Sequence, residues 1–354
     1  MRSLSIRTAN MLTHASDAAA SAAALETEIL RPEHDFMMMV RAEAGTGTPA
    51  DWARQHRDFL RENLLKYGAV LIRGLQCDRD SFSEVSRVLE PKAIDYKGGI
   101  GPRRIVAEEV FTSTDLPPEA SLASHNEMSY GGYWPMRVLF FCEQQPEDRG
   151  QTTICDARRL LKSLPAALRT RLAETGVQYT RNISPRGPVK SIEQTFGTTD
   201  HGEIEAFCAE RGIRATWLAD DHLQLRQHTP AIRRHPLTGD EVFFNTLALW
   251  HPVYWRDVLK RAFPDAADPS DEDEMWQNSH FGDGKPFDDE DIRTVLRAYE
   301  EQEFAVEWQP SDIVYIDNML ASHGRRVFSG KRSILASFRA PMTAQQLSDG
   351  SHSL

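Results

Sequence analysis

The sequence has few of the features that indicate a disulfide framework, a zinc site or a membrane span. Its four cysteines, Cys77, Cys142, Cys155 and Cys208, show no CxxC spacing, which argues against zinc knuckles and paired disulfides. No run approaches the roughly 18 to 20 apolar residues that a membrane span needs. No long Lys/Arg run occurs, and the formal net charge is −11, so nucleic acid and anionic membranes are unfavourable partners. We therefore expect a cytoplasmic protein that acts on a small molecule or on another protein.

The composition is that of a globular chain that can bury a large core. Of its 354 residues, 40% are hydrophobic and 26% are charged. The N-terminus is rich in serine and alanine, and we interpret residues 1–45 as a tail that is poorly structured in part. Residues 46–345 are expected to form a single domain, followed by a short C-terminal tail at 346–354.

Helical and strand patterns alternate at the start of this domain. Apolar spacing predicts a helix over residues 52–67, with Gly68 at its end, and a short strand over 69–72. The spacing Ser81-x-x-Glu84 predicts a capping box that opens the next helix. No glycine fingerprint follows the strand, which argues against a dinucleotide-binding fold.

Further along the chain, β-like segments occur in two groups. The predicted strands cover residues 104–110, 121–127, 137–143, 152–155, 223–227, 241–245, 304–308, 312–317 and 332–338. Helical patterns cover residues 156–176, 200–211, 252–262 and 288–301. A set of strands that is interrupted by an insert at about 156–300 and then completed predicts an α+β fold with one barrel closed by sequence-distant strands. Within the insert, the acidic segment 264–291 is interpreted as an exposed loop, with a mobile lid as the alternative.

The sharpest local motif is Ser124-His125-Asn126-Glu127, at the end of a predicted strand. Residues two apart on a strand point to the same side, so His125 and Glu127 could offer an imidazole nitrogen and a carboxylate oxygen to one metal ion. Alone, the HxE triplet is weak evidence, because such triplets arise often by chance and usually lie on the surface.

A second imidazole comes from the C-terminal part of the chain. His323 follows an apolar predicted strand and precedes a glycine-containing turn that leads into another strand. With His125 and Glu127 it would complete a triad of two histidines and one carboxylate. This ligand set suits iron(II) and leaves positions open for a 2-oxo acid and O2.

A 2-oxo acid with a second carboxylate also needs a fixed cation. Arg332 is the best candidate, because it opens the strand after the His323 turn and its guanidinium can bind a carboxylate through two N–H groups. Arg339 lies seven residues further on and should face the other side of that strand. Arg325 and Arg326 are interpreted as surface charges in the turn.

At these residues the chain resembles the taurine dioxygenase-like (TauD/TfdA) family of iron(II)- and 2-oxoglutarate-dependent oxygenases. Within that family it is similar to the branch of the syringomycin-type aspartyl hydroxylase and clavaminate synthase-like enzymes. The resemblance runs from about residue 69 to residue 338. It is carried by separated blocks in the same order, at residues 69–74, 124–130, 150–152, 308–312, 317–318, 323–325 and 330–332.

The resemblance implies roles for individual residues. It implies that His125, Glu127 and His323 bind Fe(II). It also implies that Thr152 contacts 2-oxoglutarate and that Arg332 pairs with the distal carboxylate of this co-substrate. The neighbouring Gln151 departs from the family, where a second glycine or an acidic residue is common.

The implied fold is a double-stranded β-helix (jelly roll) with outer helices and an insert over the substrate, in agreement with the interrupted strand pattern. The implied activity is that of a dioxygenase that uses Fe(II), 2-oxoglutarate and O2 and releases succinate and CO2. Hydroxylation is expected, and desaturation or cyclisation would use the same site. Halogenation is disfavoured, because halogenating relatives carry a small residue where this chain has Glu127. A metal-binding, non-catalytic cupin-like protein is the alternative from another class.

The resemblance also points to an amino acid or an amino-acid-derived intermediate of antibiotic biosynthesis as the substrate, either free or tethered to a carrier protein. Candidate substrate contacts are Asn126, Asn245 and Asp283. Three arginine pairs are interpreted as solvated, with docking of a carrier protein as the alternative. They are Arg103-Arg104, Arg158-Arg159 and Arg233-Arg234.

Overall fold

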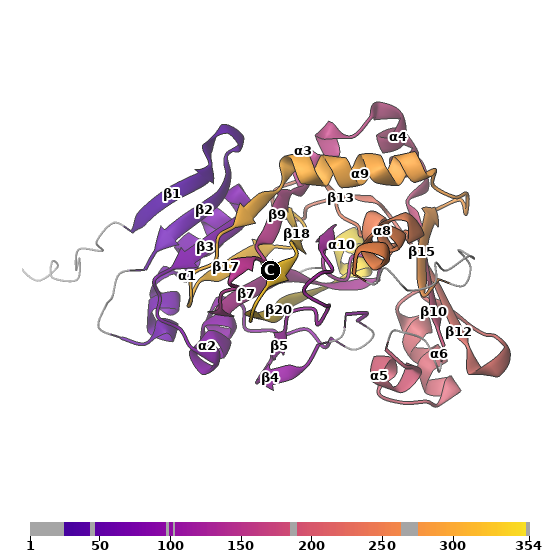
Figure 1. Ribbon diagram of the computed structural model, residues 1–354, viewed down its shortest axis with the longest axis horizontal. Coiled ribbons are helices and arrows are strands. Elements are labelled where there is room, and N and C mark those ends of the chain that lie inside the picture. Colours follow the sequence, from indigo (N-terminus) through magenta and orange to yellow (C-terminus); the bar gives the residue numbers. More distant parts are fainter. Residues whose placement is uncertain are drawn as a thin grey trace, which may run out of the picture.

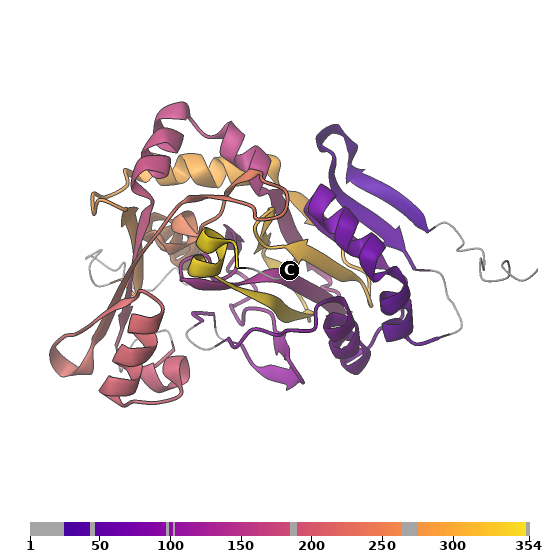
Figure 2. The same ribbon diagram turned by 180° about the vertical axis from the view of Figure 1, so that it is seen from behind.

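The computed structural model describes residues 25–42, 47–96, 99–101, 103–184, 190–262 and 275–351. Among these residues no helix is long and apolar enough to cross a membrane. All four cysteines are buried and unpaired, as their spacing predicted. Figure 1 shows the arrangement of the elements, and Figure 2 shows the same chain from behind.

The largest sheet has eight strands and forms one wall of the jelly roll. In spatial order they are β1 (Glu26–Arg31), β2 (Phe36–Arg41), β3 (Ala69–Arg73), β17 (Ile313–Asp317), β7 (Tyr133–Gln144), β20 (Ser333–Thr343), β5 (Val110–Thr112) and β4 (Ile105–Ala107). Every neighbouring pair is antiparallel except β2 and β3. Strands from both ends of the chain therefore lie side by side in this sheet.

The opposite wall is a sheet of four strands, and it carries most of the candidate site. Its order is β16 (Phe304–Val306), β9 (Thr152–Asp156), β18 (Ala321–Arg325) and β6 (Leu122–His125). A hydrophobic core with residues from both walls, such as Val138 of β7 and Ile154 of β9, lies between the two sheets. The predicted double-stranded β-helix, closed by sequence-distant strands, is thus confirmed.

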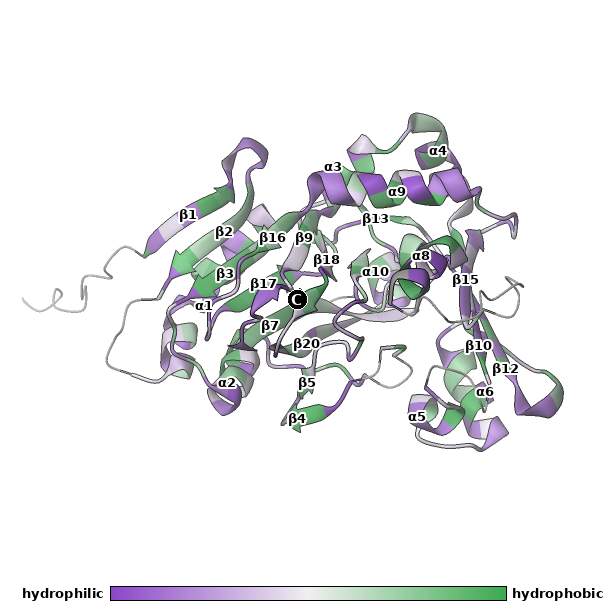
Figure 3. Cartoon of the chain, viewed as in Figure 1, coloured by the Kyte–Doolittle hydropathy of each residue, from purple (hydrophilic) through white to green (hydrophobic). Residues whose placement is uncertain are grey.

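Strands of the large sheet are buried on both faces. Along β17, Ile313 and Tyr315 pack in the cluster under α1 (Pro49–Tyr67) and α2 (Arg79–Leu89), whereas Val314 and Ile316 pack in the cluster between the sheets. This division follows from the two-residue repeat of a strand. In Figure 3 these strands are mostly green, whereas the outer helix α9 (Asp289–Gln302) alternates between green and purple.

The insert separates β9 from β16 and adds helices, a four-stranded sheet and a two-stranded sheet (Figure 1). Its helices are α3 (Ala157–Ser163), α4 (Ala166–Thr175), α5 (Ile192–Phe196), α6 (His201–Glu210), α7 (Leu247–Trp250), α8 (Pro252–Ala262) and α9 (Asp289–Gln302). Its strands are β10 (Val177–Ile183), β11 (Arg214–Trp217), β12 (Leu223–Thr229), β13 (Ile232–Arg234), β14 (Glu241–Phe243) and β15 (Gln277–Phe281). The short elements that remain are the 3-10 helices at Pro32–His34 and Ala219–Asp221, the strands β8 (Asp148–Arg149) and β19 (Phe328–Ser329), and helix α10 (Ala344–Asp349).

Three boundaries differ from the sequence-based expectation. Residues 26–41, assigned to the tail, form β1 and β2, because the apolar run Phe36–Val40 pairs with β3. Helix α2 starts at Arg79 and is capped by Asp78, so Ser81 lies inside the first turn and does not open it. The acidic segment 264–291, predicted as a loop, contains the largely buried strand β15, which pairs with β10. Residues 263–274 of that segment lie outside the described part of the chain.

Candidate metal centre and adjoining cavities

Two histidines face each other across neighbouring strands of the smaller wall. His125 is the last residue of β6, and the antiparallel ladder places it opposite His323 of β18. Directly opposed residues of such a pair share one face of the sheet. Their ring centroids are 4.6 Å apart, and both side chains are buried.

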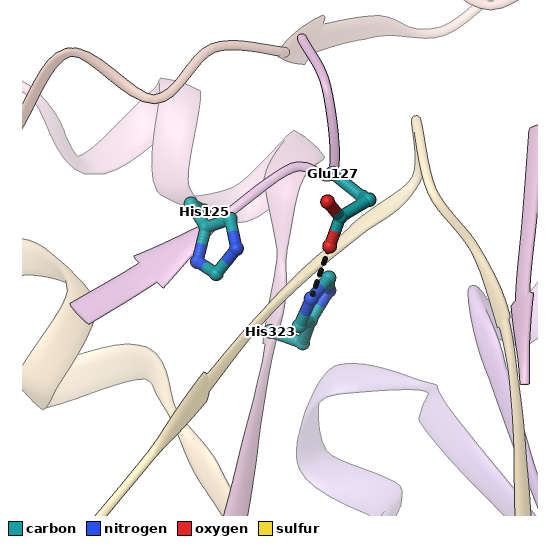
Figure 4. A group of neighbouring side chains, drawn as sticks. All are labelled: His125, Glu127 and His323. Atoms are coloured by element: carbon teal, nitrogen blue, oxygen red, sulfur yellow. Dashed lines mark ion pairs between the residues drawn. The ribbon is translucent and has the colours of Figure 1, made fainter. Parts of the chain in front are cut away.

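Glu127 joins the two histidines from a loop. The prediction that it continues the strand is wrong, because β6 ends at His125. The side chain of Asn318 holds the Glu127 backbone instead: its Oδ1 accepts from the Glu127 N–H at 2.8 Å, and its Nδ2 donates to the Glu127 carbonyl at 2.9 Å. Figure 4 shows the three side chains converging, and Glu127 Oε2 lies 3.7 Å from His323 Nε2. Each residue offers one ligand atom, and these atoms lie within 4.8 Å of one another.

The two imidazoles are oriented in different ways. Nδ1 of His125 donates to the Ala123 carbonyl at 2.9 Å, which leaves the lone pair on Nε2. His323 is held by packing against Phe140, at 4.9 Å between ring centroids, and its buried Nδ1 has no partner among the described residues. Burial, and then the neighbouring His323, lowers the pKa of His125 to about 4. His125 is therefore neutral at pH 7, as a metal ligand must be.

Both carboxylate oxygens of Glu127 accept a hydrogen bond from outside the triad. Arg103 Nη2 donates to Oε2 at 2.9 Å, and the Tyr96 hydroxyl donates to Oε1 at 3.0 Å. Burial alone would raise the pKa of Glu127, but Arg103 and the histidines hold it well below its usual range, so the group is ionised at neutral pH. Sequence reasoning missed Arg103, because an arginine pair without periodicity indicates solvated charges.

Thr152 and Arg332 meet beside the triad. Arg332 Nη2 donates to Thr152 Oγ1 at 3.3 Å, and its Nε donates to the Gly150 carbonyl at 2.9 Å. A small cavity of about 30 Å³ is lined by both residues and by His323. Burial, and then Arg325, lowers the pKa of Arg332 to about 9. No carboxylate in the described part of the chain pairs with it, so a partly buried guanidinium faces this cavity without a counter-ion.

Other arginines near the C-terminus have structural partners. Arg339 is fully buried, donates to Glu109 Oε2 at 2.7 Å and does not line this cavity, as its odd spacing from Arg332 predicted. The interpretation of Arg325 as a surface charge is wrong. Its guanidinium is buried and donates to the carbonyls of Leu116, Pro117 and Ala120, so it holds the loop that precedes β6.

A larger cavity opens on the other side of Glu127. Its volume is about 800 Å³. Its wall combines aromatic and charged side chains with aliphatic and uncharged polar ones. The aromatic residues are Tyr96, Tyr130, Trp250, Trp255 and Trp276, and the charged residues are Arg103, Arg104, Asp115, Glu127 and Lys190. This space is large enough for a metabolite of ordinary size next to the triad.

The three residues predicted as substrate contacts do not line this cavity. Asn126 and Asn245 are buried in a structural network, in which Asn126 donates to the Asn318 carbonyl and Asn245 donates to the Ala231 carbonyl. Asp283 lies in an exposed turn, where it pairs with Lys285 at 3.5 Å. The polar groups of these three side chains therefore already have partners within the protein.

Comparisons with known proteins agree with this geometry. The family model described as taurine catabolism dioxygenase TauD, TfdA family, matches residues 34–338. The dapdiamide synthesis protein DdaC of Enterobacter agglomerans is 30% identical over 282 residues, which cover 79% of this chain and 84% of that protein. A clavaminate synthase-like protein of Arabidopsis thaliana is 30% identical over 294 residues, which cover 80% of this chain and 85% of that protein.

Solved structures share the fold at lower sequence identity. The PvcB protein of Pseudomonas aeruginosa superposes with a TM-score of 0.52 at 13% identity, and the match covers 94% of this chain and 98% of that one. A taurine dioxygenase of Burkholderia xenovorans gives a TM-score of 0.50 at 13% identity and covers 91% and 92%. These likenesses support the jelly roll.

The contact between Arg103 and Glu127 leads to a first prediction. Replacing Arg103 by Met leaves a buried carboxylate without its guanidinium partner, so the free energy of unfolding of the metal-free protein should fall by roughly 3 kcal/mol at pH 7. Urea denaturation measures this change. The adjacent Arg104 is the matched control: its side chain is 76% exposed and pairs with a partly exposed Asp115. Arg104→Met should lower the free energy of unfolding by less than about 0.5 kcal/mol, and equal effects of the two variants would contradict the prediction.

Proposed function

Because this chain belongs to the TauD/TfdA family and is therefore an Fe(II)- and 2-oxoglutarate-dependent dioxygenase, we propose that His125, Glu127 and His323 hold the iron. The observation that carries this assignment is the buried convergence of two imidazoles and one ionised carboxylate within 4.8 Å. This donor set fits Fe(II), because it neutralises part of the charge and leaves neighbouring positions open.

The same proposal places the distal carboxylate of 2-oxoglutarate at the small cavity between His323 and Arg332. Arg332 supplies a partly buried positive charge with no carboxylate partner in the described chain, and Thr152 supplies a hydroxyl next to it. A guanidinium can bind a carboxylate through two N–H groups and so fixes both the position and the direction of the co-substrate. The opposite end of 2-oxoglutarate then lies toward the triad.

When bound, the iron supplies the oxidising chemistry of the family, in which 2-oxoglutarate and O2 yield succinate, CO2 and an oxidised substrate. The protein's own residues hold the reactants and exclude competing outcomes. Arg103 and Tyr96 keep Glu127 ionised and oriented, so this ligand stays in place through turnover. Because Glu127 fills the carboxylate position, no ligand site is vacated for a halide, and C–H hydroxylation is the favoured reaction.

The proposed substrate is an amino acid or an amino-acid-derived intermediate of antibiotic biosynthesis, free or tethered to a carrier protein. The cavity of about 800 Å³ next to Glu127 supports a substrate of this size. Similarity to a dapdiamide synthesis protein and to a clavaminate synthase-like protein supports the metabolic class. Desaturation or cyclisation would use the same residues and is the second candidate.

The triad assignment predicts loss of metal binding. His125→Ala and His323→Ala should each lower Fe(II) affinity by at least about 100-fold, since even the loss of a supporting contact costs 10- to 100-fold. Iron content and the weak visible charge-transfer band that appears on 2-oxoglutarate chelation measure the effect. His201→Ala, an exposed histidine of α6, is the control and should bind iron as the wild type does. Normal iron binding by folded His125→Ala and His323→Ala proteins would overturn the assignment.

The role of Arg332 predicts weaker binding of the co-substrate. Arg332→Ala removes charge-assisted hydrogen bonds, so 2-oxoglutarate affinity should fall about tenfold to a hundredfold while iron content stays unchanged. Anaerobic titration of the charge-transfer band gives the dissociation constant. The exposed Arg326, six residues earlier, is the matched control, and its change to Ala should have little effect. If both variants behave alike, the anchor lies elsewhere.

The substrate class is tested with amino acids offered free and loaded on a carrier protein, at low and high salt. A gain of one oxygen in the product indicates hydroxylation, and a loss of two hydrogens indicates desaturation or cyclisation. Turnover of a carrier-bound substrate should fall more steeply with salt than turnover of a free one, because two protein surfaces must be steered together. If no amino acid in either form couples 2-oxoglutarate consumption to product, the substrate class is wrong while the dioxygenase chemistry stands.

A further inference from the structure

The charged side chains of the larger cavity do not balance one another. Arg103 pairs with Glu127 at 2.9 Å, and Arg104 pairs with Asp115 at 3.2 Å. Glu127 and Asp115 are the two carboxylates among the described residues that line this cavity, and each of them pairs with one of these arginines. Lys190 remains as a cation without an acidic partner among the described residues.

The surroundings of Lys190 leave it able to bind a ligand. It is partly buried, and its Nζ donates to the Gly99 carbonyl at 3.1 Å. An ammonium group has three N–H donors, so two remain for a bound molecule. Burial, followed by Arg181 and Arg103, lowers the pKa of Lys190 to about 8, and the group is still mostly protonated at pH 7.

A tyrosine connects this lysine to the metal centre. Lys190 Nζ lies 5.6 Å from the centroid of the Tyr96 ring, and the hydroxyl of the same tyrosine donates to Glu127 Oε1. An anionic group bound at Lys190 is therefore separated from the triad by little more than one aromatic ring. The rest of a ligand would extend along the aromatic wall formed by Trp250, Trp255 and Trp276.

We propose that Lys190 is the anchor for a free carboxylate of the substrate and that it makes the enzyme specific for acids over their amides and thioesters. This inference rests on the proposed function, because it concerns the substrate of the same site. A partly buried cation that lies beside an aromatic wall and lacks a counter-ion among the described residues favours an anion with an apolar remainder. A substrate tethered through its only carboxylate would lose this contact, so the anchor favours a free amino acid or one with a second carboxylate.

The test uses matched pairs of ligands. The 20 proteinogenic L-amino acids and their primary amides are titrated by calorimetry into the full chain without added iron. At least one acid should bind about tenfold to a hundredfold more tightly than its amide. Lys190→Met should weaken that acid to the level of the amide and leave amide binding unchanged. Lys190→Arg should retain the preference within a few-fold, because it keeps the charge.

The matched control is Arg104→Met, which removes one positive charge from the same cavity. It should keep the preference of the wild type, because Arg104 is exposed and pairs with Asp115. The assignment of Lys190 as the anchor is wrong if no acid binds more tightly than its amide, or if the Lys190→Met protein still binds the acid more tightly than the amide. Since no iron is present, this result is independent of the triad. A protein that passes this test but never consumes 2-oxoglutarate with an amino acid would overturn the proposed oxidation and leave the anchor in place.

Discussion

The turn that joins β17 to β18 is the constraint on which the metal centre depends. Glu127 lies beyond the end of its strand, so no ladder fixes it, and the side chain of Asn318 binds both its backbone N–H and its carbonyl. Asp317 in turn accepts from the N–H groups of Met319 and Leu320. The same turn leads directly into the strand of His323. Glu127 and His323, two proposed ligands that are about 200 residues apart in sequence, are thus positioned by one short segment.

A buried ionic contact fixes this turn against the large sheet. Arg137 of β7 donates to Asp317 Oδ2 at 2.6 Å, and His235 of the insert lies 3.1 Å from the same oxygen. Burial alone would raise the pKa of Asp317, but Arg137 and His235 hold it well below its usual range. Removing either partner of such a pair is costly, because it leaves an uncompensated charge in the interior. The insert therefore has a structural link to the metal centre as well as a place in the cavity wall.

The sequence predicted best those candidate site residues that lie on a strand or directly next to one. His125 and His323 lie on strands whose apolar neighbours identify them, and Arg332 directly precedes the strand β20, which starts at Ser333 and not at Arg332 as predicted. Arg103 and Lys190 lie outside the helices and strands, and only the tertiary fold brings them to Glu127 and the cavity. The sequence also predicted a loop where the structure has β15. Its acidic neighbours favour an exposed segment, whereas pairing with β10 buries this strand.

Each of the two cavities next to the triad is lined by one cation that has no carboxylate partner in the described structure. The chain has 52 acidic and 41 basic residues, so carboxylates are plentiful, yet Arg332 and Lys190 have none as a partner in the described structure. Burying a cation without a counter-ion is unfavourable, and binding an anion offsets that cost. One cation lies in the small cavity beside His323 and the other in the large cavity beside Glu127. This charge distribution suits a site that receives two carboxylates together, one from the co-substrate and one from the substrate, on either side of the metal ligands.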